Sequence, residues 1–226
     1  MGIKYRVNKK YFNKWSKKMA YTLGYLFADG SVEYWKSFRA HYLKAISTDY
    51  ELISQLRKEL RAEHRIEIIP PESKKHKIKY RLRIGDKELY DSVKKLGIYP
   101  RKSLTMSFPK IEDQYLPDFV RGYFDGDGCV YIEKQKRLRI IFTCGSHKFL
   151  ETLCLKLKNK LALKQTKIYN SRRSYQLSYS TNDALKIYKY MYPPRTRLYL
   201  TRKKGVFTKA LKKCDNWKVK EQKLAT

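Results

Sequence analysis

The chain has 226 residues, 42% of them hydrophobic, which is enough to bury the core of one large domain or two small ones. Its 52 lysines and arginines outnumber 21 aspartates and glutamates, and the net charge of +31 favours a polyanionic partner, nucleic acid before an anionic membrane surface. No run approaches the roughly 18 apolar residues of a membrane span, and the N-terminus lacks the apolar core of a secretory signal, so we expect an intracellular protein with no membrane partner. The four cysteines form no CxxC pair, so we expect reduced thiols and no zinc site.

Hydrophobic periodicity predicts the same order of elements twice along the chain. In the first copy, helices are expected over 16–29, 48–62 and 87–96, and strands over 31–36, 39–46, 65–69 and 76–85. In the second copy, helices are expected over 115–127, 147–161 and 182–191, and strands over 129–134, 137–144, 165–170 and 174–180. Ser47 and Ser146 are expected to cap the second helix of their copies. We therefore predict an α+β protein made of two pseudo-symmetric αββαββα repeats.

The repeat also predicts how the chain is divided. We expect an N-terminal arm over 1–15, a first repeat over 16–103, a linker over 104–114, a second repeat over 115–213 and a flexible tail over 214–226. A last helix is expected over 203–213. Because both copies lie in one chain, the protein should be a monomer with an internal pseudo-twofold axis and should need no protein partner.

The first helix of each copy carries small residues four positions apart, Gly24 and Ala28 in one and Gly122 and Gly126 in the other. Such residues lie on one helix face and allow two helix backbones to approach closely. Glycine inside a helix costs roughly 1 kcal/mol relative to alanine. That cost, incurred in both copies, indicates that the two helices pack against each other.

Asp29 and Asp127 are expected to end these helices, each before a glycine suited to a left-handed cap, Gly30 or Gly128. A carboxylate there opposes the helix dipole, and two converging carboxylates repel each other. Divalent metal ions would relieve both effects and could stabilise the attacking and leaving oxygens of a phosphodiester. Asp-Gly is also a common hairpin signal, so a simple turn remains the alternative. An EF-hand is excluded, because Val130 stands where its loop needs glycine.

The segments TLGYLFADG (22–30) and VRGYFDGDG (120–128) resemble the two LAGLIDADG motifs of single-chain homing endonucleases, and the resemblance extends over 16–213. It departs from the motif in the first copy, where Phe27 stands in place of the first aspartate; in the second copy that aspartate is Asp125. The last aspartate, which the family uses for metal, is intact in both copies. The resemblance implies two saddle-shaped antiparallel sheets that lie astride DNA and are joined through the motif helices.

The resemblance also implies the site. Mg²⁺, with Mn²⁺ as a substitute, would be held by Asp29 and Asp127 together with the carbonyls of Ala28 and Gly126. Basic residues just past the third helix of each repeat would approach the scissile phosphates. Lys102 in RKS (101–103) and Lys203 in TRKK (201–204) are the candidates, with Arg202 or Lys204 as alternatives if the second alignment is shifted.

Basic and polar side chains alternate with apolar ones along several predicted strands. In 77–84, Ile78, Tyr80, Leu82 and Ile84 should face the core and the basic residues the opposite side. A two-stranded ribbon fits the DNA major groove, where arginine and glutamine read guanine and adenine. The candidate DNA contacts are Lys77, Lys79, Arg81, Arg83, Arg137, Arg139, Arg172, Arg173, Gln176 and Ser178. The alternative is a solvated face, or lysines that prevent edge pairing.

The predicted function is therefore that of a site-specific homing endonuclease. It would hydrolyse both strands of a long asymmetric DNA target with divalent metal ions, leave short 3′ overhangs by family resemblance, and promote the mobility of its host intron or intein. An RNA maturase or a non-cleaving DNA-binding protein on the same fold is the main alternative. A membrane-surface protein is a third possibility that only the charge favours.

Overall fold

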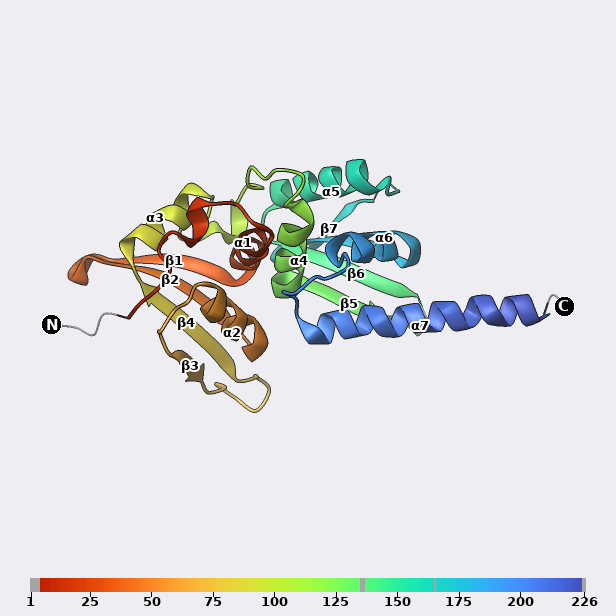
Figure 1. The fold of residues 1–226 in the computed structure, drawn as a ribbon, viewed down its shortest axis with the longest axis horizontal. Helices are drawn as coiled ribbons and strands as arrows, with labels where there is room; N and C mark the ends of the chain where they lie inside the picture. Colours follow the sequence, from red (N-terminus) through yellow and green to blue (C-terminus); the bar gives the residue numbers. More distant parts are fainter. Residues whose placement is uncertain (1–4, 135–136, 165, 225–226) are drawn as a thin grey trace.

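The computed structural model describes residues 5–134, 137–164 and 166–224 (Figure 1). The first repeat contains α1 (Lys17–Asp29), β1 (Gly30–Trp35), β2 (Ala40–Ser47), α2 (Tyr50–Glu59), β3 (Ile66–Ile69), β4 (Lys79–Gly85) and α3 (Lys87–Lys95). The second contains α4 (Leu116–Asp127), β5 (Gly128–Ile132), β6 (Leu138–Cys144), α5 (His147–Leu161), β7 (Ile168–Ser171), β8 (Ser174–Ser180) and α6 (Thr181–Met191), and α7 (Thr201–Leu224) follows. The two αββαββα repeats are thus confirmed.

Each repeat forms one antiparallel four-stranded sheet, with strand order β1-β2-β4-β3 in the first and β5-β6-β8-β7 in the second. The helices α2 and α3 contact the first sheet, and α5 and α6 contact the second. Along β4, Leu82 and Ile84 are buried toward this helical layer while Arg81 and Arg83 alternate with them. The opposite face of each sheet therefore carries the polar side chains of the strands.

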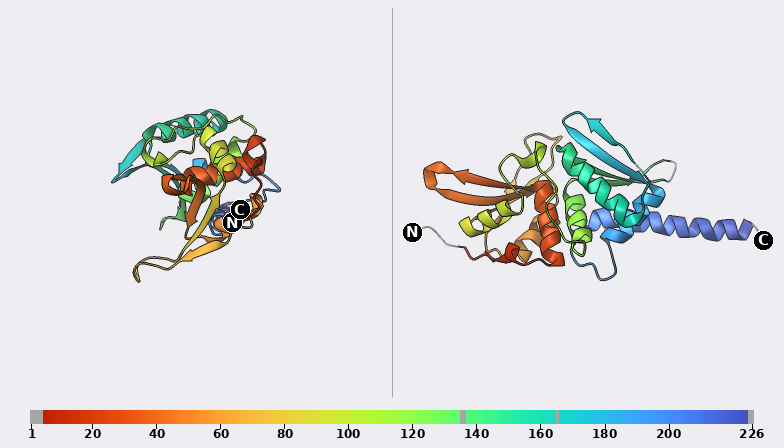
Figure 2. Two further views of the ribbon diagram at one scale, coloured as in Figure 1. Left: turned by 90° about the vertical axis from the view of Figure 1, so that its left-hand side faces the viewer. Right: turned by 90° about the horizontal axis from the view of Figure 1, so that it is seen from above.

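The helices α1 and α4 lie side by side between the two sheets (Figures 1 and 2). A Cβ built on Gly24 would lie 2.1 Å from the carbonyl oxygen of Phe119, and one on Gly122 would lie 2.0 Å from that of Tyr21. Real Cβ atoms do not come so close to a backbone oxygen, so only glycine allows this approach. The predicted close packing of the two helices is confirmed.

We expect Gly122→Ala to lower the free energy of unfolding by about 3 kcal/mol, because overpacking against a backbone that cannot move aside forces the helices apart. Urea unfolding measures this change in the free energy of unfolding, provided that the variant and the wild type have the same m value. Gly205→Ala in α7 is the matched control: nothing lies within 4 Å of its new Cβ, so stability should stay the same or rise by up to about 1 kcal/mol. A Gly122→Ala protein as stable as the wild type would contradict the packing argument.

The glycines that follow these helices are not left-handed, contrary to the prediction. Gly30 and Gly128 have φ of −87° and −82° and begin β1 and β5 in extended conformation. A Cβ at either position would lie 2.5 Å from a carbonyl oxygen of the last helical turn, that of Leu26 or Phe124. Glycine is needed here because the strand starts so close to the helix, and not because of a positive φ.

Three predicted element ends also differ. Ser47 ends β2, so Asp49 takes the N-cap position of α2, whereas Ser146 caps α5 as predicted. Ile78 precedes β4 and is 46% exposed rather than in the core. The helix α7 continues away from the body of the protein (Figure 2), so the predicted flexible tail from 214 is helical as far as Leu224. Parts of the predicted arm (1–4), the predicted strand over 165–170 (residue 165) and the predicted tail (225–226) lie outside the described residues.

Candidate active site

Asp29 and Asp127 are the last residues of α1 and α4, and the packing of these helices brings them to the same end of the pair. At this end, a Cβ built on Gly126 would lie 2.4 Å from the Cβ of Ala28 and 3.6 Å from Oδ2 of Asp29. Asp29 is half-buried, and Asp127 is exposed. The structure thus brings the two predicted aspartates together and places Ala28 beside Gly126.

The pKa of both carboxyl groups is raised. That of Asp29 rises to about 7, chiefly because the crowded helix ends separate it from water and next because Asp127 repels its charge. Reduced contact with water also raises the pKa of Asp127, even though its side chain reaches solvent. Lys102 and Lys203 lower both pKa values in part. The arrangement disfavours two negative charges unless a cation joins them.

Lys203 lies in the first turn of α7 and is only 3% exposed. Its Nζ donates hydrogen bonds to the carbonyl oxygens of Phe124 at 2.6 Å, Asp125 at 2.8 Å and Gly126 at 3.2 Å. An ammonium group at the end of α4 also interacts favourably with the helix dipole. Burial lowers the pKa of Lys203 to about 8, while Asp125 raises it in part. Lys203 is therefore firmly held beside the carboxylates.

Lys102 begins the 3-10 turn η3 (Lys102–Leu104) and is 4% exposed. Burial lowers its pKa, and the negative charges of Asp127 and Asp29 oppose that shift. Within the described residues its Nζ makes no hydrogen bond to protein. The two predicted lysines therefore lie near the carboxylates in unequal ways, one anchored by three carbonyls and the other without such an anchor.

The geometry also resolves the alignment at the start of α7. Arg202 points to Asp49 with a two-pronged contact, Nε to Oδ1 at 2.7 Å and Nη2 to Oδ2 at 2.6 Å. Lys204 lies over the ring of Tyr199, with Nζ 3.8 Å from the ring centroid. Of these neighbours, only Lys203 faces the carboxylates.

Most of the predicted DNA contacts lie on the sheet faces away from the helices. These are Lys79, Arg81 and Arg83 on β4, Arg139 on β6, and Gln176 and Ser178 on β8. The others flank the strands and are exposed: Lys77 precedes β4, Arg137 precedes β6, and Arg172 and Arg173 form the turn between β7 and β8. The strand predicted over 76–85 was too long at its start, so Lys77 is a loop residue.

Comparison with known proteins identifies this architecture. Residues 115–191 match the family model of a LAGLIDADG-like domain. The homing endonuclease I-WcaI bound to its DNA recognition sequence has the same fold, with a TM-score of 0.60, 14% identity, and coverage of 88% of this chain and 90% of that one. The two repeats of this chain therefore share the two-repeat LAGLIDADG fold. The predicted resemblance is confirmed.

Two further structures share the fold at similar distance. I-DmoI in complex with DNA and Mn has a TM-score of 0.50 at 20% identity and covers 80% of this chain and 98% of its own. The N-terminal LAGLIDADG domain of DUF199/WhiA has a TM-score of 0.53 at 13% identity, with coverage of 88% and 93%. No curated protein sequence matches the chain. None of the helices in the described residues is long and apolar enough to cross a membrane.

The first aspartate of the second LAGLIDADG motif has a role that the sequence did not reveal. Asp125 is fully buried, and its Oδ2 accepts hydrogen bonds from Tyr21 Oη at 2.9 Å and from the backbone N–H of Leu200 at 2.8 Å. Burial raises its pKa to about 6. Asp125 thereby fixes the segment that leads into Lys203. In the other motif Phe27 packs against Phe119 and needs no such contact.

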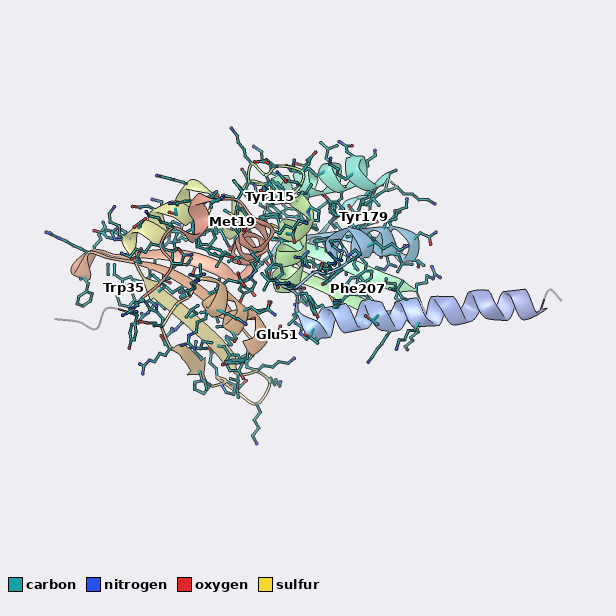
Figure 3. The ribbon with its side chains drawn as sticks, in the orientation of Figure 1. Met19, Trp35, Glu51, Tyr115, Tyr179 and Phe207 are labelled. Atoms are coloured by element: carbon teal, nitrogen blue, oxygen red, sulfur yellow. The ribbon has the colours of Figure 1, made fainter. Side chains whose placement is uncertain are left out.

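A second unpredicted cluster joins the repeats next to the site. The start of α7 lies against the start of α2, where Glu51 of α2 contacts Thr201 of α7 (Figure 3). Thr201 donates to Glu51 from its backbone N–H at 3.1 Å and from its hydroxyl at 2.7 Å, and Arg202 binds Asp49. The hydrogen bond from Arg202 lowers the pKa of Asp49. These contacts hold α7 across the repeat boundary, and with it Lys203.

Proposed function

We propose that the protein is an intracellular, monomeric, site-specific endonuclease that hydrolyses both strands of a long asymmetric DNA target and promotes the mobility of its host intron or intein. The observation that carries this proposal is the convergence of Asp29 and Asp127 at the ends of two tightly packed helices, with Lys102 and Lys203 buried beside them. Two sheets with basic and polar outer faces lie on either side of this centre. A net charge of +31 supports a polyanionic partner.

The donor atoms at the centre suit a hard divalent cation. Asp29 and Asp127 supply carboxylate oxygens and Ala28 can supply a carbonyl oxygen, which are the ligands that Mg²⁺ and Mn²⁺ favour. The carbonyl oxygen of Gly126 accepts a hydrogen bond from Lys203 at 3.2 Å and could bind a cation only through its second lone pair. In the described part of the chain no three His, Cys, Asp or Glu side chains gather around a possible metal position, so this centre would rely on two carboxylates together with carbonyl oxygens. A bound divalent ion would supply Lewis-acid stabilisation of a phosphodiester and of the leaving 3′ oxygen.

The chain's own residues would then divide the work. The sheet faces bind the DNA backbone and base edges, and their unlike side chains, basic on β4 and uncharged on β8, favour an asymmetric target. Lys102 and Lys203 would place positive charge near the scissile phosphates. I-WcaI is bound to its DNA recognition sequence and I-DmoI to DNA with Mn, which supports the same partner and cofactor here.

The test is cleavage of a plasmid library that carries candidate target sites. With Mg²⁺ or Mn²⁺ the protein should linearise a small subset of plasmids, and EDTA should prevent this because the reaction needs the metal. Sequencing of the cut ends gives the target and should reveal 3′ overhangs. If no plasmid in a broad library is cut and the protein instead binds RNA or DNA without cutting, the maturase or non-cleaving alternative replaces this proposal.

A further inference from the structure

The outer face of each sheet pairs an arginine with a glutamate from the neighbouring strand. Glu67 on β3 lies directly across from Arg81 on β4 in the strand register. Glu133, which follows β5, pairs with Arg139 on β6. The first pair belongs to the second hairpin of its repeat and the second pair to the first hairpin, so the pairs are not copies of each other. The same kind of arginine–glutamate pair therefore occurs at two positions that the repeat does not relate.

The two pairs share one geometry. In Arg81 both Nε and Nη2 donate to Oε2 of Glu67, the first at 3.0 Å. In Arg139, Nε at 3.0 Å and Nη2 at 2.9 Å likewise meet Oε1 of Glu133. A guanidinium has five N–H groups in a rigid plane. Each pair occupies the edge formed by Nε and Nη2 and leaves the edge formed by Nη1 and Nη2 without a carboxylate, which is the edge that bidentate recognition of guanine O6 and N7 requires. In Arg139, Nη1 also donates a long hydrogen bond to Oγ of Ser178 at 3.5 Å, a contact that guanine would have to replace or share.

Glutamates are unexpected on a surface that meets a polyanion, because they repel phosphates and weaken binding to any sequence. These two are also half-buried: the side-chain exposures are 32% and 27% for Arg81 and Glu67, and 30% and 21% for Arg139 and Glu133. A half-buried pair holds its arginine in one orientation before DNA arrives, so less side-chain entropy is lost on binding. The loss of general affinity is then offset by discrimination between bases.

We propose that Glu67 and Glu133 are specificity-determining residues. Each holds its arginine so that the free edge reads one guanine in the major groove, and each repeat contributes one such guanine to the target. This inference rests on the proposed function of site-specific DNA recognition.

The experiment selects bound sequences from a randomised double-stranded DNA library without divalent cations, so that no DNA is cut. The wild type should select a site with a guanine preference at two positions. Glu67→Ala should reduce that preference about fivefold or more at one position and Glu133→Ala at the other, because each bidentate contact discriminates by that order. Both variants should bind random DNA more tightly. Arg81→Lys should lose the guanine preference at the same target position as Glu67→Ala, although the positive charge is kept.

Glu33→Ala is the matched control. Glu33 forms an ion pair with Lys44 on the same outer face of the first sheet, so its removal changes the charge equally without freeing an arginine. It should raise affinity for all sequences and leave every base preference unchanged. If Glu67→Ala and Glu133→Ala behave like Glu33→Ala, the inference is overturned while the proposed function stands. If the wild type selects no sequence at all, both are overturned.

Discussion

Asparagine at Asp29 or Asp127 is expected to abolish double-strand cleavage while DNA affinity stays nearly unchanged. Each substitution removes a negative oxygen ligand from the shared centre, and the loss of several kcal/mol of metal-derived stabilisation slows cleavage by about a thousandfold or more. Affinity persists because it rests on the basic sheet faces. Both aspartates are the last residues of their helices, α1 and α4, and would share one metal centre, so either change should stop cutting of both strands.

Single-turnover cleavage and equilibrium binding of the same target measure these effects separately. Asp91→Asn provides a matched control, because Asp91 lies on the surface of α3, where its carboxylate pairs with Lys87. It should cut at the wild-type rate. Cleavage of both strands at that rate by the Asp29 or Asp127 variant would disprove the assignment.

The Asp29→Asn protein offers an independent readout that needs no DNA. Without metal, the pKa of Asp29 is about 7 in the folded protein and 3.8 as its ordinary value. The folded state therefore holds this proton more tightly, and the wild type loses stability as pH rises from about 4 to about 7. Asparagine cannot ionise. In EDTA the melting temperature of the variant should be higher than that of the wild type at pH 8 and equal to it near pH 4. Equal melting temperatures at both pH values would count against the crowded carboxylate pair.

Features that depend on spacing along the chain could be predicted from the sequence. The repeat placed Gly24 with Gly122 and Asp29 with Asp127, because two helices of similar sequence related by a pseudo-twofold must meet through equivalent small residues. The element order follows from the same periodicity. These predictions needed only local pattern and symmetry.

Features that depend on contacts between distant segments could not be predicted. Gly30 looked like a left-handed cap because local propensity favours it, but β1 begins so close to α1 that extended glycine is required instead. Asp125 differs from its partner Phe27 through the hydrogen bonds that it accepts from Tyr21, Tyr192 and Leu200, all from distant segments. The contact of Arg202 with Asp49 crosses the repeat boundary, and no spacing rule indicates it.

Methionine at Lys203 is expected to slow single-turnover cleavage by on the order of a hundredfold and also to destabilise the protein. The Nζ of Lys203 satisfies the carbonyls of Phe124, Asp125 and Gly126 at the end of α4. Methionine cannot donate to them, so buried acceptors lose their partner and the positive charge beside the carboxylates disappears. Cleavage and the free energy of unfolding should therefore fall together.

Lys102→Met should separate these two effects. Lys102 is as deeply buried, at 4% exposure, but no carbonyl in the described part of the chain holds its ammonium group. Its replacement should leave stability unchanged or raise it, since a buried charge without hydrogen-bond partners costs free energy. Cleavage should still slow by about a hundredfold if this charge acts on the scissile phosphate, with affinity almost constant.

If Lys102 only positions DNA, its replacement would instead weaken binding and lower the salt dependence of binding by about one unit of slope. Wild-type cutting by both variants at saturating protein would remove both lysines from the active site.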